Sequence, residues 1–514
     1  MKTTLIPLIA FIGLISGFIA FTASEAVKKA DAAPPEEEKC SLERQLPGMC
    51  PSNGNQFGAI YSLDGDPMVS IATSSGTPLQ RIRTDEDVLY YPTEDYYAPV
   101  VGVAVNQVAY KGLLANAQTI LQSNATYSNI SRLEGNTIIT TYVSVGMQEA
   151  FEQIKEFQDS SIAVVNYDGS ILVNTSSTAN GMQEYLERYF QSEADKNNPE
   201  SETEAAGTPA VISPMDYFVG IHDASVSRQV GSSFKPITAR VLSLCSDQLP
   251  PGYDITRTDF PDPGSVTVRS YKVSNWDADT AGKRQLSLAE AFIHSSNVYF
   301  LRFADAMGLE IFRSQLDSIF KTDQSIYTGT LELQPITNND LYPEDQFIVY
   351  LPYGQSACVS GIRMASMYQL LDGSFYVPFD VAQVRTPDGE IIYNADPQQV
   401  NGYSYEVDMA TDPVIDGLRQ SFFSYICLDD GSIRSVLNDH DSELLLSGRL
   451  LAKSGTAIVG NGCQEEHTMA LSVLNEEQNK IICTAFLDVH GDEVTYAEEI
   501  DKLLHVLERL EVFA

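Results

Sequence analysis

A serine and a lysine three positions apart, Ser232 and Lys235, have the types and the spacing that nucleophilic catalysis needs. Residues three apart lie on one face of a helix, so the serine hydroxyl can meet the lysine amine. A hydroxyl becomes a good nucleophile when an adjacent base takes its proton. A lysine is such a base once burial and neighbouring cations lower its pKa. The pair therefore predicts a serine nucleophile with a lysine as its base.

The sequence around this pair predicts the start of a helix, with Gly231 near the expected cap. An apolar run at helical spacing follows: Phe234, Ile237, Val241 and Leu242. The first turn of a helix offers unpaired N–H groups and the positive end of the helix dipole, which favour an oxyanion. Ser318 and Lys321 repeat the same spacing, however, and a helix with a solvated lysine would show it too. The pair therefore needs partners from elsewhere in the chain.

Two further short motifs can supply those partners. Ser295-x-Asn297 is the one Ser-x-Asn sequence in the chain, and Lys453-Ser-Gly-Thr456 contains the one Lys-[Ser/Thr]-Gly sequence. Taken alone, the first is read as a polar cap at a helix end and the second as a lysine on an edge strand. Taken together with the serine and lysine pair, they predict an acyl-transfer site.

The polar residues of these motifs have expected roles in catalysis. Ser295 can relay a proton to a leaving amine, while Asn297 fixes Lys235 and a substrate amide. Lys453 adds a second cation, which helps to keep Lys235 neutral and attracts a carboxylate.

The rest of the third motif is predicted to bind substrate through Ser454, Gly455 and Thr456. Gly455 lacks a side chain, so an extended peptide can pair with its strand. The hydroxyl of Thr456 can bind a substrate carboxylate, and its N–H can form an oxyanion hole with that of Ser232.

Hydrophobic periodicity predicts the elements that must position these residues. Helices are expected at 147–157, 286–307, 362–371 and 496–510, and strands at 161–165, 171–173, 446–454, 468–474 and 480–487. The Ser295 motif then lies within a helix, and Lys453 lies at the end of a strand. Strands at both ends of a segment with a helical middle imply one sheet completed by distant parts of the chain.

Size and charge limit what the protein can do. A chain of 514 residues exceeds the usual single core, so two or more domains are expected. The 32 Lys and Arg against 69 Asp and Glu give a net charge of −37, which argues against nucleic acid as a partner. The seven cysteines include no C-x-x-C pair, and the six histidines do not pair at metal-ligand spacing. No metal or organic cofactor is expected, because side chains complete the chemistry.

The N-terminal part of the chain predicts a membrane anchor. The charge-free run from Leu5 to Ala23 would span about 28 Å as a helix, close to one hydrocarbon core. This length favours an uncleaved anchor over a cleaved signal peptide, with the rest of the chain outside the cell. The expected domains are residues 1–24 as transmembrane anchor, 25–55 as extracytoplasmic stalk, 56–138 as N-terminal spacer or dimerisation-like domain, and 139–514 as catalytic domain.

The three motifs, in this order, resemble those of penicillin-binding proteins and serine β-lactamases. From about residue 139 to the C-terminus the chain resembles the transpeptidase domain of high-molecular-mass penicillin-binding proteins. The segments that carry this resemblance are Gly231-Ser-Ser-Phe-Lys-Pro236, Asn275-Trp-Asp277, Ala289 to Phe300, Tyr353-Gly-Gln355 and Lys453-Ser-Gly-Thr-Ala457. The anchor and the segment from Gly58 to Gly65 resemble the monofunctional, class B type.

This resemblance implies an α/β fold of the α+β kind, similar to serine D,D-peptidases and β-lactamases. It would have a central antiparallel sheet flanked by helices, an inserted helical subdomain, a smaller N-terminal domain and a transmembrane anchor. The implied activity is that of a peptidoglycan D,D-transpeptidase, in which Ser232 attacks the D-Ala–D-Ala carbonyl of a stem peptide and a neighbouring stem resolves the acyl-enzyme. β-Lactams would acylate the same serine. The resemblance also implies a single-pass protein of the cell membrane, with its catalytic domain extracytoplasmic and a membrane glycan polymerase as a partner.

The sequence departs from the family pattern at three places, none of which removes a reacting group. Val230 stands where proline is usual, Ser360-Gly361 where Thr-Pro is common, and Ser454 where threonine is commoner. These departures bear on specificity and on whether the enzyme is fully active.

Two other functions stay open. A β-lactamase or D,D-carboxypeptidase would resolve the acyl-enzyme with water, and Glu390 to Asn394 has the Glu-x-x-x-Asn spacing of a deacylation element. That segment follows the turn signal Pro387-Asp-Gly389, however, and is predicted to be a strand. A non-catalytic penicillin-sensing or scaffold homologue would keep the fold without turnover.

Overall fold

A computed structural model provides the structure of the chain. It describes residues 59–62, 67–69, 81–83, 87–89, 96, 98–101, 104–105, 108–109, 113, 138–143, 146–157, 159–181, 185, 224–327, 332–338, 342–372, 374–385, 390–395, 404–406, 412–427, 443–459, 464–475, 480–490 and 496–510. The predicted anchor and stalk lie outside these residues. None of the helices in the described part is long and apolar enough to span a bilayer.

The chain divides into two compact units. One contains Met1–Val145, Ala179–Ile221 and Asp380–Asp396, and the other contains Gly146–Thr178, His222–Phe379 and Pro397–Ala514. The second unit holds all three motifs and is called the catalytic unit below.

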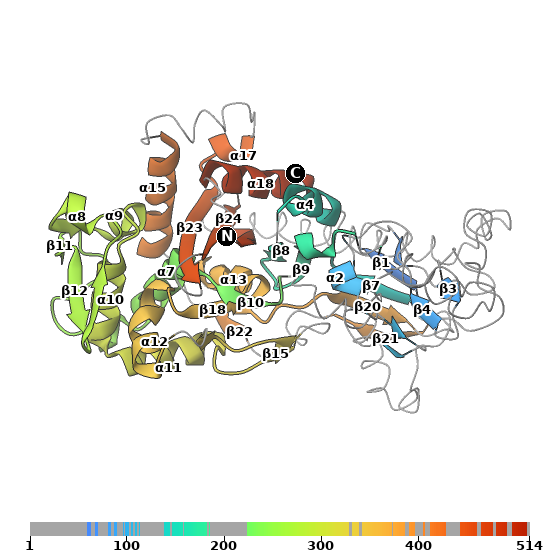
Figure 1. The fold of residues 1–514 in the computed structure, drawn as a ribbon, viewed down its shortest axis with the longest axis horizontal. Helices are drawn as coiled ribbons and strands as arrows, with labels where there is room; N and C mark the ends of the chain where they lie inside the picture. Colours follow the sequence, from blue (N-terminus) through green and yellow to red (C-terminus); the bar gives the residue numbers. More distant parts are fainter. Residues whose placement is uncertain are drawn as a thin grey trace, which may run out of the picture. The chain divides into compact units, whose positions relative to one another are not determined.

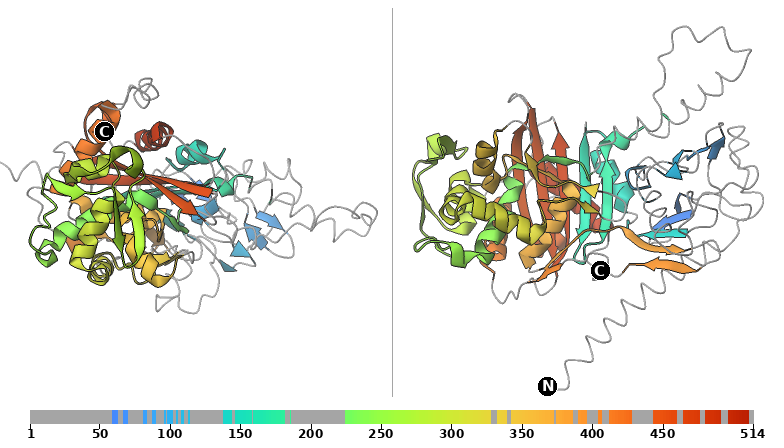
Figure 2. Two further views of the ribbon diagram at one scale, coloured as in Figure 1. Left: turned by 60° about the vertical axis from the view of Figure 1, so that its left-hand side comes forward. Right: turned by 90° about the horizontal axis from the view of Figure 1, so that it is seen from below.

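A five-stranded antiparallel sheet forms the centre of the catalytic unit, in the order β23-β24-β25-β8-β9. Its strands are β8 (Ser160–Asn166), β9 (Ile171–Ser176), β23 (Leu450–Val459), β24 (Gln464–Leu474) and β25 (Ile481–His490). Figure 2 (right) shows the strands from the two ends of the unit side by side, β23 to β25 in red and orange and β8 and β9 in teal. The prediction of one sheet completed by distant segments is confirmed.

One strand differs from its predicted length. β23 does not end at Lys453 but continues to Val459, because each of its residues from Leu450 onward pairs with β24. Gly455 does not interrupt the strand, since it pairs with Thr468. The third motif therefore lies in the middle of a strand.

Helices cover both faces of this sheet (Figure 1). The amphipathic helices α4 (Gly146–Ile154) and α18 (Tyr496–Arg509) pack against each other on one face, and α13 (Gly361–Tyr368) lies on the other. The apolar side of α18 is buried, as its spacing predicts: Ile500, Leu503, Leu504 and Leu507. Burial of such a side chain contributes roughly 1.5–3 kcal/mol relative to leaving it exposed.

The remaining helices of the catalytic unit form a helical subdomain and its connections. They are α7 (Lys235–Leu244), α8 (Ala278–Ala281), α9 (Leu288–Ile293), α10 (Asn297–Met307), α11 (Leu309–Phe320), α12 (Glu344–Tyr350), α15 (Pro413–Cys427) and α17 (Glu443–Leu446). Short 3-10 helices are η2 (Ser177–Ala179), η3 (Gly231–Phe234), η4 (Ser246–Gln248), η5 (Leu351–Tyr353) and η6 (Gln369–Asp372).

Short strands complete the unit. A three-stranded sheet has the order β10 (Ser227–Gln229), β18 (Ala357–Ser360) and β17 (Thr337–Asn338). The two-stranded pairs are β11 (Phe260–Asp262) with β14 (Arg284–Leu286), β12 (Ser265–Val268) with β13 (Tyr271–Ser274), β15 (Ile326–Tyr327) with β16 (Glu332–Leu333), and β19 (Ser374–Tyr376) with β22 (Ser404–Glu406).

The helix predicted over 286–307 is two helices. α9 ends at Ile293 and α10 begins at Asn297, with His294, Ser295 and Ser296 between them. Ser295 has φ +47°, a left-handed conformation that cannot continue a right-handed helix. The break therefore falls on the second motif.

The other unit has its own five-stranded sheet, in the order β2-β1-β7-β20-β21. Its strands are β1 (Ala59–Ser62), β2 (Pro67–Val69), β7 (Ile138–Thr141), β20 (Val381–Arg385) and β21 (Ile391–Asn394). A second sheet has the order β3 (Arg81–Arg83), β4 (Asp87–Leu89), β5 (Ala104–Val105) and β6 (Val108–Ala109), and α2 spans Ala98–Val101.

This sheet changes the predicted domain boundary. β7 crosses the predicted division between residues 138 and 139, and it pairs with β1 and β20 in the N-terminal unit. Residues 380–396, far along the chain, join the same unit because β20 pairs with β7. Long-range pairing of this kind leaves no mark in local periodicity.

Candidate active site

The turn that carries Ser232 is a 3-10 helix, η3, which leads directly into α7 at Lys235. Pro236 falls in the first turn of α7, where a proline costs little. Lys235 Nζ lies 2.7 Å from Ser232 Oγ. The sequence predicted one helix from Gly231, and the tighter first turn still brings the two side chains together.

Lys235 is fully buried and lies against four oxygen atoms. Its Nζ is 2.6 Å from the carbonyl oxygen of Ser295, 2.8 Å from Asn297 Oδ1 and 3.0 Å from Ser295 Oγ, besides Ser232 Oγ. The Ser295 carbonyl and Asn297 Oδ1 can only accept hydrogen bonds, so they take up both N–H groups of a neutral amine. Its lone pair is then left for a hydroxyl hydrogen. This arrangement suits a base that faces Ser232.

Electrostatics favour the neutral form of Lys235. Burial, and then the charge of Lys453, lower the pKa of Lys235 well below its ordinary value. None of the carboxylates in the described part of the chain contributes to this shift in its pKa. A buried lysine without a nearby anion loses its proton more readily than a solvated one, which a general base requires.

Ser295 lies between the two lysines. Its Oγ is 3.0 Å from Lys235 Nζ and 3.2 Å from Lys453 Nζ. A hydroxyl with a base on one side and an ammonium on the other can pass a proton between them. The left-handed backbone at Ser295 turns both its carbonyl and its hydroxyl towards Lys235.

Lys453 projects from β23 into the same site. It is buried, and its Nζ also donates to the carbonyl oxygen of Ser454 at 2.9 Å. Burial lowers the pKa of Lys453 to about 7. The third motif thus reaches the nucleophile, and the structure brings together five of the predicted residues: Ser232, Lys235, Ser295, Asn297 and Lys453.

Gly455 has a role inside the protein, and its predicted pairing with an extended peptide stays a prediction. A Cβ at this position would lie 2.4 Å from Thr468 Oγ1, 2.4 Å from the Val230 carbonyl oxygen and 2.7 Å from the Ser233 amide nitrogen. Thr468 Oγ1 also donates to the Val230 carbonyl at 2.9 Å. The missing side chain therefore lets β23 pack against the nucleophile turn, and the reason for a glycine lies inside the protein.

Successive side chains of a strand point to opposite faces of the sheet, so Ser454 and Thr456 lie on the other face of β23 from Lys453. The side chain of Ser454 is buried and lines a small cavity with Phe422, Tyr425 and Met469, so it points away from Lys453. Thr456 is partly exposed and pairs with His467. Their roles in substrate binding stay predictions.

Sequence reasoning attached no role to Gly354, which turns out to shape the site. It has φ +82°, and a Cβ there would lie 1.9 Å from the carbonyl oxygen of Gly231 and 2.7 Å from Phe234 Cβ. Gln229, just before the nucleophile turn, donates from Nε2 to the Gln355 carbonyl at 2.9 Å. The Tyr353-Gly-Gln355 sequence was the available signal, and its role is to support the turn that carries Ser232.

Other candidate residues lie elsewhere. Ser318 lies on α11, Lys321 follows the end of that helix with φ +53°, and both line an open surface depression rather than the site. No group of three or more metal-ligating side chains converges within the described residues. Glu390 precedes β21 in the sheet of the other unit, and the prediction that Glu390 to Asn394 is a strand is confirmed.

The geometry of the residues around Ser232 suits acyl transfer. A serine hydroxyl faces a buried lysine whose pKa is lowered, a second hydroxyl connects that lysine to another, and backbone N–H groups lie where β23 meets the nucleophile turn. A nucleophile, a base and a relay for the leaving-group proton are the parts that such a reaction needs.

Residues 194–420 match the family model of the penicillin binding protein transpeptidase domain. This match contains the first two motifs and ends before Lys453. No curated protein matches the chain in sequence.

Several solved structures share the fold. The D,D-transpeptidase domain of a peptidoglycan glycosyltransferase from Eggerthella lenta is 17% identical, with a TM-score of 0.58, covering 89% of this chain and 99% of that one. PBPA from Mycobacterium tuberculosis is 16% identical, with a TM-score of 0.58, covering 89% of this chain and 100% of that one. Penicillin binding protein 3 from the same organism, complexed with ampicillin, is 15% identical, with a TM-score of 0.61, covering 89% of this chain and 96% of that one. At these identities the likeness establishes the fold, and it extends over nearly the whole length of each neighbour.

Proposed function

We propose, because residues 194–420 match the family model of the penicillin binding protein transpeptidase domain, that the chain is a serine D,D-transpeptidase that cross-links peptidoglycan stem peptides and is acylated by β-lactams. The observation that carries this proposal is the position of Lys235 Nζ, 2.7 Å from Ser232 Oγ and within 3.0 Å of both Ser295 and Asn297.

The first half-reaction forms an acyl-enzyme. Ser232 Oγ attacks the carbonyl carbon between the two D-alanines, and its proton moves to the lone pair of Lys235. The oxyanion is received by the N–H groups of Ser232 and Thr456. Ser295 Oγ then passes the proton from Lys235 to the nitrogen of the departing D-alanine as the C–N bond breaks.

The second half-reaction reverses these steps with another amine. The amino group of a neighbouring stem peptide attacks the ester, and its proton returns through Ser295 and Lys235 to Ser232 Oγ. Lys453, when protonated, places a positive charge next to Ser295, which favours the neutral form of Lys235. The same charge suits the terminal carboxylate of a stem peptide or of a β-lactam. No cofactor takes part in this scheme.

Solved neighbours support the β-lactam part of the proposal. Penicillin-binding protein A from M. tuberculosis has been solved as a penicillin G acyl-enzyme complex, with 16% identity and a TM-score of 0.60. The Ser232 site has the residues that an acyl-enzyme of this kind would need.

The alternatives have less support. A β-lactamase or carboxypeptidase needs water activation at the acyl-enzyme, but the Glu-x-x-x-Asn match between the second and third motifs, Glu390 to Asn394, falls at a strand of the other unit. A non-catalytic sensor or scaffold would not need the full set of contacts around Lys235. The transpeptidase is therefore the function that fits the site best.

The place of the protein in the cell is part of the proposal. Residues 1–24 would anchor it in the cell membrane as a single span, with the catalytic unit extracytoplasmic, where peptidoglycan is. The segment that precedes the catalytic unit would act as a spacer. A membrane glycan polymerase would supply the strands to be cross-linked.

Labelling with a fluorescent penicillin tests the function. The wild-type protein is expected to acquire a stable covalent label, and Ser232→Ala is expected to lose it completely, because the nucleophile is gone. Ser318→Ala is the matched control, since Ser318 shares the Ser-x-x-Lys spacing but lies on α11, and it should label like the wild type. Rapid loss of the label would point to a β-lactamase, and absence of label in the folded wild type would point to a scaffold.

The rate of acylation should depend on pH in a bell-shaped manner. Lys235 acts when neutral, so the rate rises with pH through its lowered pKa. Lys453 acts when charged, so the rate falls as pH rises above about 7, where Lys453 loses its proton. Stopped-flow acylation over the pH range in which the protein stays folded would measure the limbs. In Lys453→Arg the guanidinium stays charged, so the alkaline limb should disappear; an unchanged limb would mean that Lys453 does not cause it.

A further inference from the structure

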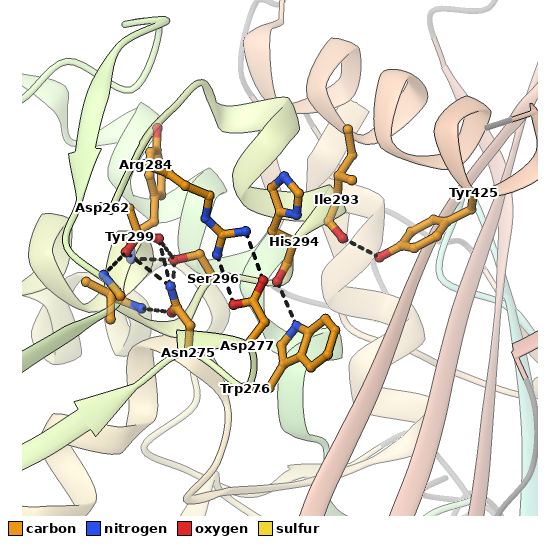
Figure 3. A network of polar contacts seen from close by, with 12 residues as sticks. Asp262, Asn275, Trp276, Asp277, Arg284, Ile293, His294, Ser296, Tyr299 and Tyr425 are labelled. Atoms are coloured by element: carbon orange, nitrogen blue, oxygen red, sulfur yellow. Dashed lines mark hydrogen bonds and ion pairs between the residues drawn. The ribbon is translucent and has the colours of Figure 1, made fainter. Parts of the chain in front are cut away.

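A buried polar network forms around Ser296, the residue that directly follows Ser295 in the chain (Figure 3). It consists of Asp262 at the end of β11, Asn275 just after β13 and Ser296 at the N-cap of α10, and it is called the Asp262 network below. The exposed fractions of the three residues are 1%, 4% and 0%. Three segments that are separate in sequence thus meet in this network.

The Asp262 carboxylate is the centre of this network. It accepts hydrogen bonds from Ser296 Oγ at 2.6 Å, from Asn275 Nδ2 at 2.8 Å and from the Gly264 amide at 2.8 Å. Within the described residues no cation forms an ion pair with it. A buried carboxylate is costly unless hydrogen bonds satisfy it, so its partners are held firmly in place.

Asn275 and its neighbour Ser274 connect the network to the catalytic loop. Asn275 Oδ1 accepts from the Val298 amide at 3.0 Å, and the carbonyl of Ser274 accepts from Asn297 Nδ2 at 3.1 Å. The second contact fixes which way the Asn297 amide points, so that its Oδ1 faces Lys235. The network therefore orients one of the two acceptors on the base.

The other acceptor is the carbonyl of Ser295, which directly precedes Ser296. Ser296 Oγ accepts from the Tyr299 amide at 2.9 Å and donates to Asp262, which ties the start of α10 to β11. Trp276 adds a further hydrogen bond to this loop, because its indole N–H donates to the His294 carbonyl at 3.1 Å (Figure 3). Ser295 lies between these fixed points in a left-handed conformation that a serine seldom adopts by itself.

We propose that Asp262, Asn275 and Ser296 are positioning residues that hold Ser295 in its left-handed conformation and so keep its carbonyl and hydroxyl, together with Asn297 Oδ1, in contact with Lys235. This inference rests on the proposed acyl-transfer function. The three residues act through Ser295 and Asn297, not on the substrate. Loss of the network should therefore slow the chemical step and leave the initial binding of a β-lactam unchanged.

Two N-cap serines provide a matched test. Ser296 caps α10 within the network, and Ser287 caps α9 through a capping box with Glu290, away from it. Each serine-to-alanine substitution removes one cap, and Ser296→Ala also removes a hydrogen bond to the buried Asp262 carboxylate, so Ser296→Ala should lower the melting temperature more than Ser287→Ala does. Acylation by a fluorescent penicillin, followed by stopped flow over a range of concentrations, separates the binding constant from the rate constant of acylation.

Ser296→Ala is expected to lower the acylation rate constant roughly ten- to a hundredfold, because displacement of catalytic groups by about 1 Å has effects of this size. Its binding constant should stay within about threefold of wild type. Ser287→Ala should keep both constants within about twofold. Equal acylation rate constants in the two variants, or a loss confined to binding, would overturn the proposal. A folded wild type without label would overturn the transpeptidase function itself, which is a different result.

A charge swap adds a second, independent test. Asp262→Asn leaves two amides in contact, and Asn275→Asp places two carboxylates together, so each single variant should be acylated slowly. The double variant again has one carboxylate and one amide, and the carboxylate that replaces the Asn275 amide can still accept from the Val298 amide. We expect it to recover most of the acylation rate that the single variants lose. A double variant that folds but is no faster than the slower single variant would contradict the network.

Discussion

Lys235→Ala is expected to slow the acylation of Ser232 by about a thousandfold, within the range that a general base contributes. The reason is the contact between Lys235 Nζ and Ser232 Oγ, since no other base of the described chain lies in hydrogen-bond contact with that hydroxyl. Stopped-flow measurement with a fluorescent penicillin gives the rate constant. Folding should persist, because the substitution removes a buried amine whose desolvation is unfavourable.

Lys235→Arg tests whether Lys235 acts as a base or only through a positive charge. A guanidinium keeps a cation beside Ser232 but does not lose its proton at any relevant pH. We expect a loss as large as that of Lys235→Ala. Lys321→Ala, which removes the lysine of the second Ser-x-x-Lys match, should change nothing. An arginine variant with a tenth or more of the wild-type rate would show that Lys235 acts through its charge and not as a base.

The proximity of the serine and the lysine of the first motif could be predicted from the sequence because their spacing is local. Ser232 and Lys235 are one helical turn apart, and a 3-10 turn preserves this proximity as well as an α-helix does. The strands and helices at the ends of the catalytic unit also followed from periodicity, as the buried face of α18 shows. The sequence within each of these elements is enough to predict its secondary structure.

Features that depend on tertiary contacts could not be predicted in this way. The apolar pattern over 286–307 is continuous, and only the contacts around Ser295 and Ser296 reveal why the helix breaks there. The reason for a glycine at 455 is the nucleophile turn that packs against it. The assignment of 380–396 to the N-terminal unit likewise depends on a strand pairing between distant parts of the chain.

Gly354→Ala is expected to have the largest effect on stability among the single substitutions considered. Gly354 has φ +82°, so an alanine is strained there by roughly 1–2 kcal/mol before any contact is counted. Its Cβ would also lie 1.9 Å from the Gly231 carbonyl oxygen, which is backbone of the nucleophile turn and cannot simply rotate away. Together these effects should cost about 3–5 kcal/mol. Denaturant unfolding measures the loss.

Gly252→Ala is the control that separates the strain of a left-handed backbone from the steric clash of an added Cβ. Gly252 has φ +94°, but a Cβ there meets nothing within 4 Å, so only the strain remains, about 1–2 kcal/mol. Any folded fraction of Gly354→Ala should also be acylated slowly, because relief of the collision must move Gly231 and with it Ser232. Equal losses of stability in the two variants would mean that the nucleophile turn adapts to the added methyl group. In that case the tight packing of Gly354 against Gly231 would not be what holds Ser232 in front of its base.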